Sequence, residues 1–131
     1  MVAIPAEYHD LFEKRSFLSF GTLTPDGAPH VTPVWVSYDE DAEHILVNTA
    51  RGRRKDKNLR NDGRVGGCIL DPDDPYRYVG FQGEVVELTT DGAVEHIDEL
   101  ARRYMDVDEY PHHGEEDGER VLVRIEPTRV W

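Results

Sequence analysis

The feature that most constrains this chain's fold is a series of short strand-forming runs, each ended by a strong turn signal. The clearest turn is Pro25-Asp26-Gly27, which separates residues 16–24 from residues 30–38. Proline presets the first position of a β-turn, and glycine permits the positive φ that several turn types require. Because so short a connection joins neighbouring antiparallel strands, the two runs predict a β-hairpin.

Six runs of this kind predict six strands, over residues 16–24, 30–38, 44–49, 64–70, 76–88 and 120–126. Apolar spacing predicts helices over residues 5–14 and 94–104. A third helix of about three turns is expected after residues 44–49 and a turn, and it ends near residues 61–63, a good C-terminal stop signal. Strands that come mostly in hairpins favour a mainly β, α+β fold, in which a small six-stranded antiparallel barrel is flanked by helices. The length of 131 residues is close to the commonest domain size, so residues 1–131 are expected to form a single domain.

Two details of the predicted strands concern where the sheet is open. Pro29 and Pro33 cannot donate hydrogen bonds to a neighbouring strand, so residues 30–38 are predicted to be bulged or to lie at an edge. Gly66 and Gly67 leave residues 64–70 with little side-chain bulk. They indicate either the close approach of a ligand or another backbone, or tight packing against the neighbouring strand.

Positive charge is concentrated in one window of an otherwise acidic chain. Between residues 51 and 64 there are seven basic residues and two acidic ones, while the whole chain has a formal net charge of −12. The window follows an apolar run and has Gly52 at its start, which predicts a strand, a turn and the start of a helix. That geometry binds phosphate well. The alternative is a solvent-exposed basic helix face whose charge compensates that of neighbouring acidic residues. The basic residues are Arg51, Arg53, Arg54, Lys55, Lys57, Arg60 and Arg64.

The acidic remainder argues against several classes of partner. A net charge of −12 disfavours nucleic acid or an anionic membrane as a general partner. No apolar run approaches the ~20 residues that span a bilayer, and the N-terminus does not resemble a signal peptide. Cys68 is the single cysteine, so no intrachain disulfide is expected. Together these observations predict a cytoplasmic protein. The scarcity of lysine beside abundant Asp and Glu indicates adaptation to high salt or a GC-rich genome.

No arrangement of residues marks a catalytic or metal centre. There is no apparent Ser-His-Asp set, catalytic cysteine or pair of carboxylates, so no catalytic residue is predicted. His112 and His113 lie in the acidic loop at residues 106–119. Two adjacent histidines cannot by themselves fix a coordination geometry, so no metal is predicted.

Three stretches, in this order, resemble the pyridoxamine-phosphate-oxidase-like split barrels. Residues 20–35 resemble the first hairpin of that superfamily, and residues 48–60 resemble its phosphate-binding turn. Residues 70–78, followed by 83–86, are similar to its deazaflavin-dependent branch. The resemblance covers nearly the whole chain and implies the six-stranded antiparallel split β-barrel known as the FMN-binding split barrel.

The resemblance also implies a homodimer with two cofactor sites at the subunit interface. The implied cofactor is the 8-hydroxy-5-deazaflavin coenzyme F420, or alternatively FMN. By analogy, three basic residues hold the cofactor phosphate: Arg53, Lys55 and Lys57. Three side chains are implied to line the ring site: Val34, Trp35 and Val36. Backbone groups of Val47, Asn48 and Thr49 are implied to join them, and Tyr76, Arg77 and Tyr78 to approach from the following strand.

The implied function is that of an oxidoreductase. A hydride would pass between reduced deazaflavin and a small unsaturated organic substrate, while the protein orients the reactants and excludes water. Coenzyme F420 is favoured over FMN because seven basic residues exceed the need of one phosphate and F420 carries an anionic oligoglutamate tail. The alternatives are an FMN-dependent oxidase or reductase of the same fold, and a non-enzymatic flavin or haem carrier. Pyridoxamine phosphate oxidation itself is not expected, because the chain is short for it.

Overall fold

Seven antiparallel strands form one sheet in the order β2-β1-β5-β6-β7-β4-β3. The computed structural model describes residues 2–115 and 118–131. The strands are β1 (Leu18–Leu23), β2 (Pro29–Val34), β3 (Ser37–Asp39), β4 (His44–Ala50), β5 (Arg64–Asp71), β6 (Asp74–Thr89) and β7 (Arg120–Val130). The helices are the 3-10 helix η1 (Ala6–Phe12) and the α-helices α1 (Arg54–Asn61) and α2 (Ala93–Met105).

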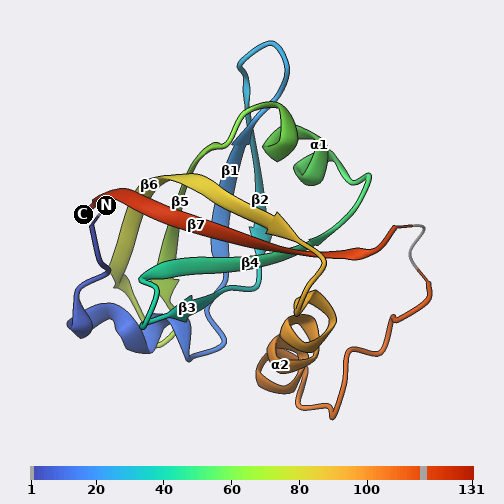
Figure 1. The fold of residues 1–131 in the computed structure, drawn as a ribbon. Coiled ribbons are helices and arrows are strands. Elements are labelled where there is room, and N and C mark those ends of the chain that lie inside the picture. Colours follow the sequence, from blue (N-terminus) through green and yellow to red (C-terminus); the bar gives the residue numbers. More distant parts are fainter. Residues whose placement is uncertain (1, 116–117) are drawn as a thin grey trace.

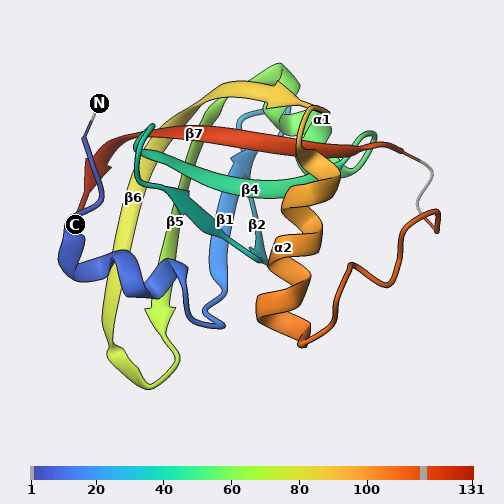
Figure 2. The same ribbon diagram turned by 60° about the horizontal axis from the view of Figure 1, so that its bottom comes forward.

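The sheet curls into a barrel that does not close. Figures 1 and 2 show β4 and β7 crossing over β1 and β5, so that the sheet encloses a core. The edges are β2 and β3, and within the described residues no ladder joins them. Helix α1 packs against β1 and β4, α2 packs against β4 and β7, and η1 packs against β3 and β5. None of the described helices has the length and apolar character needed to cross a membrane. The predicted split antiparallel barrel with flanking helices is therefore confirmed.

The strand count differs from the prediction, because the described residues form seven strands rather than six. The run predicted at residues 30–38 divides into β2 and β3 at Trp35 and Val36. Strand β2 pairs with β1 at one edge, whereas β3 pairs with β4 at the other, so one continuous strand could not serve both. The Val36 N–H donates to the hydroxyl of Tyr104 at 3.3 Å instead of to a strand. The edge position predicted from Pro29 and Pro33 is confirmed.

Helix α1 is also shorter than predicted, with eight residues rather than about three turns. The preceding turn takes up the difference. Gly52 has a φ of 92°, and the Arg53 N–H donates to the Ala50 carbonyl at 3.2 Å. Only glycine adopts such a φ readily, which explains the glycine at the start of the basic window.

Gly66 and Gly67 on β5 face opposite sides of the sheet. A Cβ on Gly67 would lie 2.6 Å from Leu18 Cδ1 and 2.8 Å from the Ser19 carbonyl oxygen. A Cβ on Gly66 would have the Phe81 carbonyl oxygen at 3.4 Å as its nearest neighbour. Gly67 thus satisfies core packing, whereas Gly66 leaves the outer face of the sheet open.

A chain of polar groups joins α2 to the sheet. His96 Nε2 lies 2.9 Å from Ser37 Oγ on β3, and His96 Nδ1 lies 3.1 Å from Asn48 Nδ2 on β4. Asn48 Nδ2 also donates to the Ala93 carbonyl at 2.8 Å, and Arg120 Nε donates to Asn48 Oδ1 at 2.8 Å. These bonds hold α2 over β3, β4 and β7.

His96 is nearly buried, and this changes its titration. Burial, followed by the positive charges of Arg103, Arg124 and Arg120, lowers the pKa of His96 to about 4. Because burial and neighbouring cations both disfavour the charged imidazole, His96 is neutral in the folded protein at pH 7.

The two glycines predict different tolerance of a methyl group. Gly67→Ala should lower the free energy of unfolding by about 1–3 kcal/mol, because the added Cβ meets a core side chain and a backbone carbonyl. Gly66→Ala, one residue away, should be close to neutral. Urea unfolding followed by circular dichroism measures both variants. Equal destabilisation of the two proteins would contradict the placement of these residues.

The lowered pKa of His96 predicts that the folded protein loses stability on mild acidification. The ordinary pKa of 6.5 lies above the folded value of about 4, so between these values the unfolded chain binds more protons. Stability therefore falls as the pH falls, by about 2 kcal/mol between pH 7 and pH 5 from this residue. Urea unfolding at both pH values should show a smaller decrease in His96→Gln, which cannot titrate. The same decrease in both proteins would contradict the assignment.

Candidate functional site

A groove of about 210 Å³ lies at the opening of the barrel, between the end of β2, the start of α1 and the inner face of α2. The structure brings five of the predicted site residues to its walls: Val34, Trp35, Asn48, Arg53 and Lys55. Six further lining residues were not predicted from the sequence: Phe17, Pro33, Ile97, Leu100, Tyr110 and Arg120. The groove therefore combines aromatic, aliphatic and cationic walls.

The aromatic wall is built around Trp35. Its indole stacks on the Tyr104 ring, with centroids 5.1 Å apart and planes 5° apart. The Tyr110 ring meets Trp35 edge-on at 6.3 Å, and Phe17 packs against Tyr104 at 5.5 Å. Because Tyr104 covers one face of Trp35, the cluster is held in place and the rest of the indole can meet a planar ligand.

The turn before α1 is pinned by a buried carboxylate. Asp56, 2% exposed, accepts hydrogen bonds from the Gly52 N–H at 2.9 Å and from Arg60 Nε at 2.9 Å. Arg60 thus compensates the buried charge of Asp56 rather than serving a ligand. The pair fixes the turn that places Arg53 at the N-cap of α1.

Lys55 is the cation whose surroundings most favour an anion. Its Nζ donates to Thr32 Oγ1 at 3.1 Å, and no described carboxylate forms an ion pair with it. Burial, and then the positive charge of Arg53, lowers the pKa of Lys55. A half-buried ammonium group beside another cation is costly, and an anion bound in the groove would relieve that cost.

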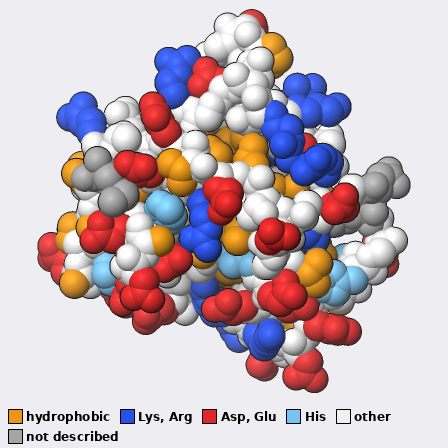
Figure 3. Space-filling model, in the orientation of Figure 1, with side chains coloured by type: hydrophobic (Ala, Val, Ile, Leu, Met, Phe, Trp, Pro, Cys, Tyr) orange, Lys and Arg blue, Asp and Glu red, His pale blue; other side chains and the backbone are white. Residues whose placement is uncertain are grey.

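The other basic residues of the window divide into two groups. Arg64 forms an ion pair with Asp62 at 2.7 Å, so the Asp62 carboxylate compensates its charge. Arg51, Arg54 and Lys57 are exposed, and none of them forms an ion pair with another described residue. Lys57, a predicted phosphate ligand, lies outside the groove. Figure 3 shows Lys and Arg side chains gathered over α1, above a surface where acidic side chains predominate.

The backbone of β4 borders the groove along an open edge. The ladder between β3 and β4 ends at the pair Ser37 and Leu46, while β4 continues to pair with β7 on its other side. Of the described strands, none pairs with this edge of β4 beyond Leu46. The side chains of Val36, Val47 and Thr49 are buried, so these predicted residues can reach a ligand only through backbone groups.

Three predicted residues lie away from the groove, at the β5–β6 hairpin. Tyr76 is 93% exposed and Tyr78 is 46% exposed. Arg77 is ion-paired with Asp10 at 2.7 Å and with Asp71 at 2.8 Å, which ties η1 to β6. Its hydrogen bonds lower the pKa of Asp10, whereas the pKa of Asp71 is lowered first by the Asp73 N–H and then by Lys14 and Arg77. Within one chain none of the three contributes to the groove. Their predicted role would require a second subunit.

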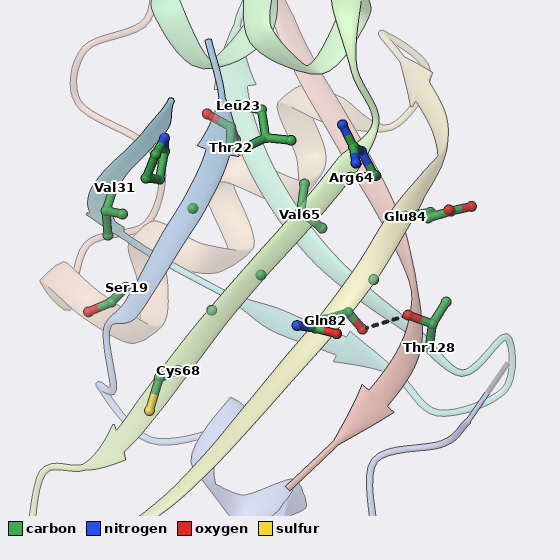
Figure 4. Close-up of a pocket in the computed structure, with 15 residues that line it drawn as sticks. Ser19, Thr22, Leu23, Val31, Arg64, Val65, Cys68, Gln82, Glu84 and Thr128 are labelled. Atoms are coloured by element: carbon green, nitrogen blue, oxygen red, sulfur yellow. Dashed lines mark hydrogen bonds between the residues drawn. The ribbon is translucent and has the colours of Figure 1, made fainter. Parts of the chain in front are cut away.

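A larger hollow, of about 630 Å³, lies on the outer face of β1, β5 and β6. Figure 4 shows Ser19, Cys68 and Gln82 on these adjacent strands and the hydrogen bond from Thr128 to the Gln82 carbonyl. Its cation, Arg64, is already paired, and burial raises the pKa of the Cys68 thiol, which keeps it protonated. Despite its size, this hollow is poorly suited to a phosphate. The described residues contain no cluster of three potential metal ligands.

The residues that sequence reasoning missed come from distant parts of the chain. Phe17 precedes β1, Tyr110 lies in the polar loop after α2, and Arg120 begins β7. Nothing local distinguishes Tyr110 from other loop residues. His96, which holds Asn48, had one available signal, because it shares a helical face with Ala93 and Leu100.

Comparison with solved structures identifies the fold. A structure named F420 reductase shares 27% identity over 98% of both chains, with a TM-score of 0.81. The conserved hypothetical protein Rv2991 from Mycobacterium tuberculosis shares 27% identity over 99% of this chain and 84% of its own, with a TM-score of 0.76. HupZ from group A Streptococcus shares the fold, with 19% identity over 97% of this chain and 91% of its own, and a TM-score of 0.67.

A search of curated proteins finds no match. The family model described as pyridoxamine 5'-phosphate oxidase matches residues 4–131, which include every strand, every helix and the whole groove. The strand order, the open barrel and the structural neighbours agree with that match. The chain therefore belongs to the pyridoxamine 5'-phosphate oxidase family.

Proposed function

We propose that this protein is an oxidoreductase that holds coenzyme F420 in the groove at the barrel opening. The observation that carries the proposal is Lys55, half-buried beside Arg53 with no described carboxylate paired to it. A phosphate would compensate the charge of Lys55 and could also accept hydrogen bonds from Arg53, since Arg offers a planar fork of donors and Lys a point charge. The 27% identity to a structure named F420 reductase supports this choice of cofactor.

The remaining walls fit a flavin-type ring. Trp35 presents a flat apolar surface held by Tyr104, and the open edge of β4 presents backbone donors and acceptors near Asn48. Bound F420 would supply the hydride chemistry. The chain's own residues would bind the phosphate, orient the ring against Trp35 and exclude water from it. The substrate class that we propose is a small unsaturated organic molecule.

The exposed cations favour F420 over FMN. Arg51, Arg54 and Lys57 lie beside the proposed phosphate site and form no ion pair with other described residues. An oligoglutamate tail, which FMN lacks, would pair with them. An FMN-dependent oxidase or reductase is the alternative, because FMN would use the same phosphate contacts. A flavin or haem carrier would bind its group without reaction.

We further propose that the protein acts as a homodimer that completes the site. A groove of about 210 Å³ is smaller than the roughly 300–1,000 Å³ typical of ligand pockets. The outer face of the sheet has no side chain at Gly66, in the hollow, and it exposes Val31, Leu70 and Tyr78. A second copy seated there would bury these side chains. Sedimentation should give twice the mass of one chain, and a monomer at micromolar concentration would refute this arrangement.

Removing Lys55 should weaken cofactor binding. Lys55→Ala is expected to cost about 1.5–3 kcal/mol, roughly ten- to 150-fold in Kd for F420, because a charged hydrogen bond to phosphate is lost. Fluorescence titration with F420 and with FMN measures the effect. Arg102→Ala, on the face of α2 opposite Leu100, removes one exposed positive charge as a control and should leave Kd unchanged.

Single-turnover reaction separates the candidate functions. Reduced F420 bound to the protein should be oxidised by members of a panel of enones and quinones. Binding without transfer would favour a carrier, and tight binding of FMN with none of F420 would favour the flavin alternative. Unchanged affinity in Lys55→Ala would remove Lys55 from the site.

A further inference from the structure

The half-buried amide of Asn48 determines the protonation of its neighbours. Its Nδ2 group has two hydrogens, directed to the Ala93 carbonyl at 2.8 Å and to His96 Nδ1 at 3.1 Å. The Ala93 carbonyl can only accept, and Arg120 Nε, 2.8 Å from Asn48 Oδ1, can only donate. The amide therefore has one orientation consistent with both neighbours. In that orientation His96 Nδ1 must be an acceptor.

His96 is consequently the neutral tautomer with its proton on Nε2, which donates to Ser37 Oγ at 2.9 Å. A second proton, on Nδ1, would face the Asn48 amide hydrogens and break that bond. The charged groups around the ring are Arg103 of α2 and Arg120 and Arg124 of β7, all of them positive. The tautomer and the amide orientation support each other.

Asn48 in turn restrains Arg120. This arginine is 8% exposed, lines the groove with Lys55, and has its guanidinium 5.3 Å from the Tyr110 ring centroid. A guanidinium on a long flexible stem can take many orientations. Fixing Nε on Asn48 and the plane over Tyr110 leaves one orientation, in which a flat set of donors is held in the groove wall.

We propose that Arg120 is a third ligand-binding cation of the groove and that His96, acting through Asn48, is the residue that positions it. This inference rests on the groove being the cofactor site. Lys55 and Arg53 serve the phosphate in that proposal, and Arg120 serves the ligand's planar part. A planar guanidinium fork matches two acceptor atoms at the edge of a polar ring. His96 touches no ligand, so its effect on binding passes through the two side chains between them.

Two amide substitutions of His96 distinguish a role in positioning Arg120 from a purely structural role in holding α2 on the sheet. His96→Asn places an acceptor where Nδ1 stood and keeps the bond from Asn48. His96→Gln reaches the place of Nε2, keeps the bond to Ser37 and loses the one from Asn48. We expect the Kd for F420 to rise about five- to tenfold in His96→Gln and to stay within about twofold in His96→Asn. Equal effects in the two variants would overturn the proposal.

Arg120→Lys provides the coupling test. It keeps the charge and loses the planar fork, so affinity for F420 should fall. In that background, His96→Gln should cost no further affinity, because both changes disable the same contact. Additive losses would overturn the proposal. Circular dichroism of each variant verifies folding.

A measurement on the free protein needs no cofactor. The ¹H–¹⁵N correlation spectrum of the His96 imidazole should show a protonated Nε2 and an unprotonated Nδ1, with a slowly exchanging Arg120 Nε–H. In His96→Gln the Arg120 Nε–H should exchange faster, while in His96→Asn it should not. The opposite tautomer, or fast exchange in the wild type, would overturn the inference. If neither F420 nor FMN binds while the spectrum is as expected, the proposed function fails and the positioning of Arg120 stands.

Discussion

The structure depends on one passage of the chain, at Trp35 and Val36, from one edge of the sheet to the other. Before it the backbone pairs with β1, and after it the backbone pairs with β4. Because β2 and β3, which flank Trp35 and Val36, are the two edge strands of the sheet and do not pair with each other, the barrel stays open between them. The opening exposes the edge of β4 and places Trp35 at the mouth of the groove. The hydroxyl of Tyr104, bonded to the Val36 N–H, holds this passage and also supports the indole.

The distribution of charge follows from which cations have carboxylate partners. In a chain of net charge −12, Asp56 is committed to Arg60 and the turn, and Asp62 is committed to Arg64. The exposed pair of Arg64 and Asp62 contributes little stability, whereas Asp56 is buried and its pair with Arg60 supports the turn. Their larger effect is to decide where positive potential persists, because Lys55 lies beside Arg53 without a described acidic partner. An acidic protein thereby retains one cationic groove.

Local patterns predicted most of the fold, because alternation and turn residues act over a few positions. The division of residues 30–38 could not be predicted, since both halves favour strands and the break depends on pairing with β1 and β4. The basic window was visible as composition. Which of its members face the groove depends on the turn at Gly52 and on Asp56. Tyr110 and Arg120 join the site only through the packing of α2 and β7, for which no local signal exists.

The central claim is that the opening of the barrel holds the phosphate of a flavin-type cofactor. A crystal structure of the protein soaked with F420 tests it most directly. The account predicts a phosphate within hydrogen-bond distance of the Lys55 and Arg53 side chains, with the ring against Trp35. Cofactor bound instead in the hollow on the outer face of β1, β5 and β6, or held without contact to Lys55, would contradict it.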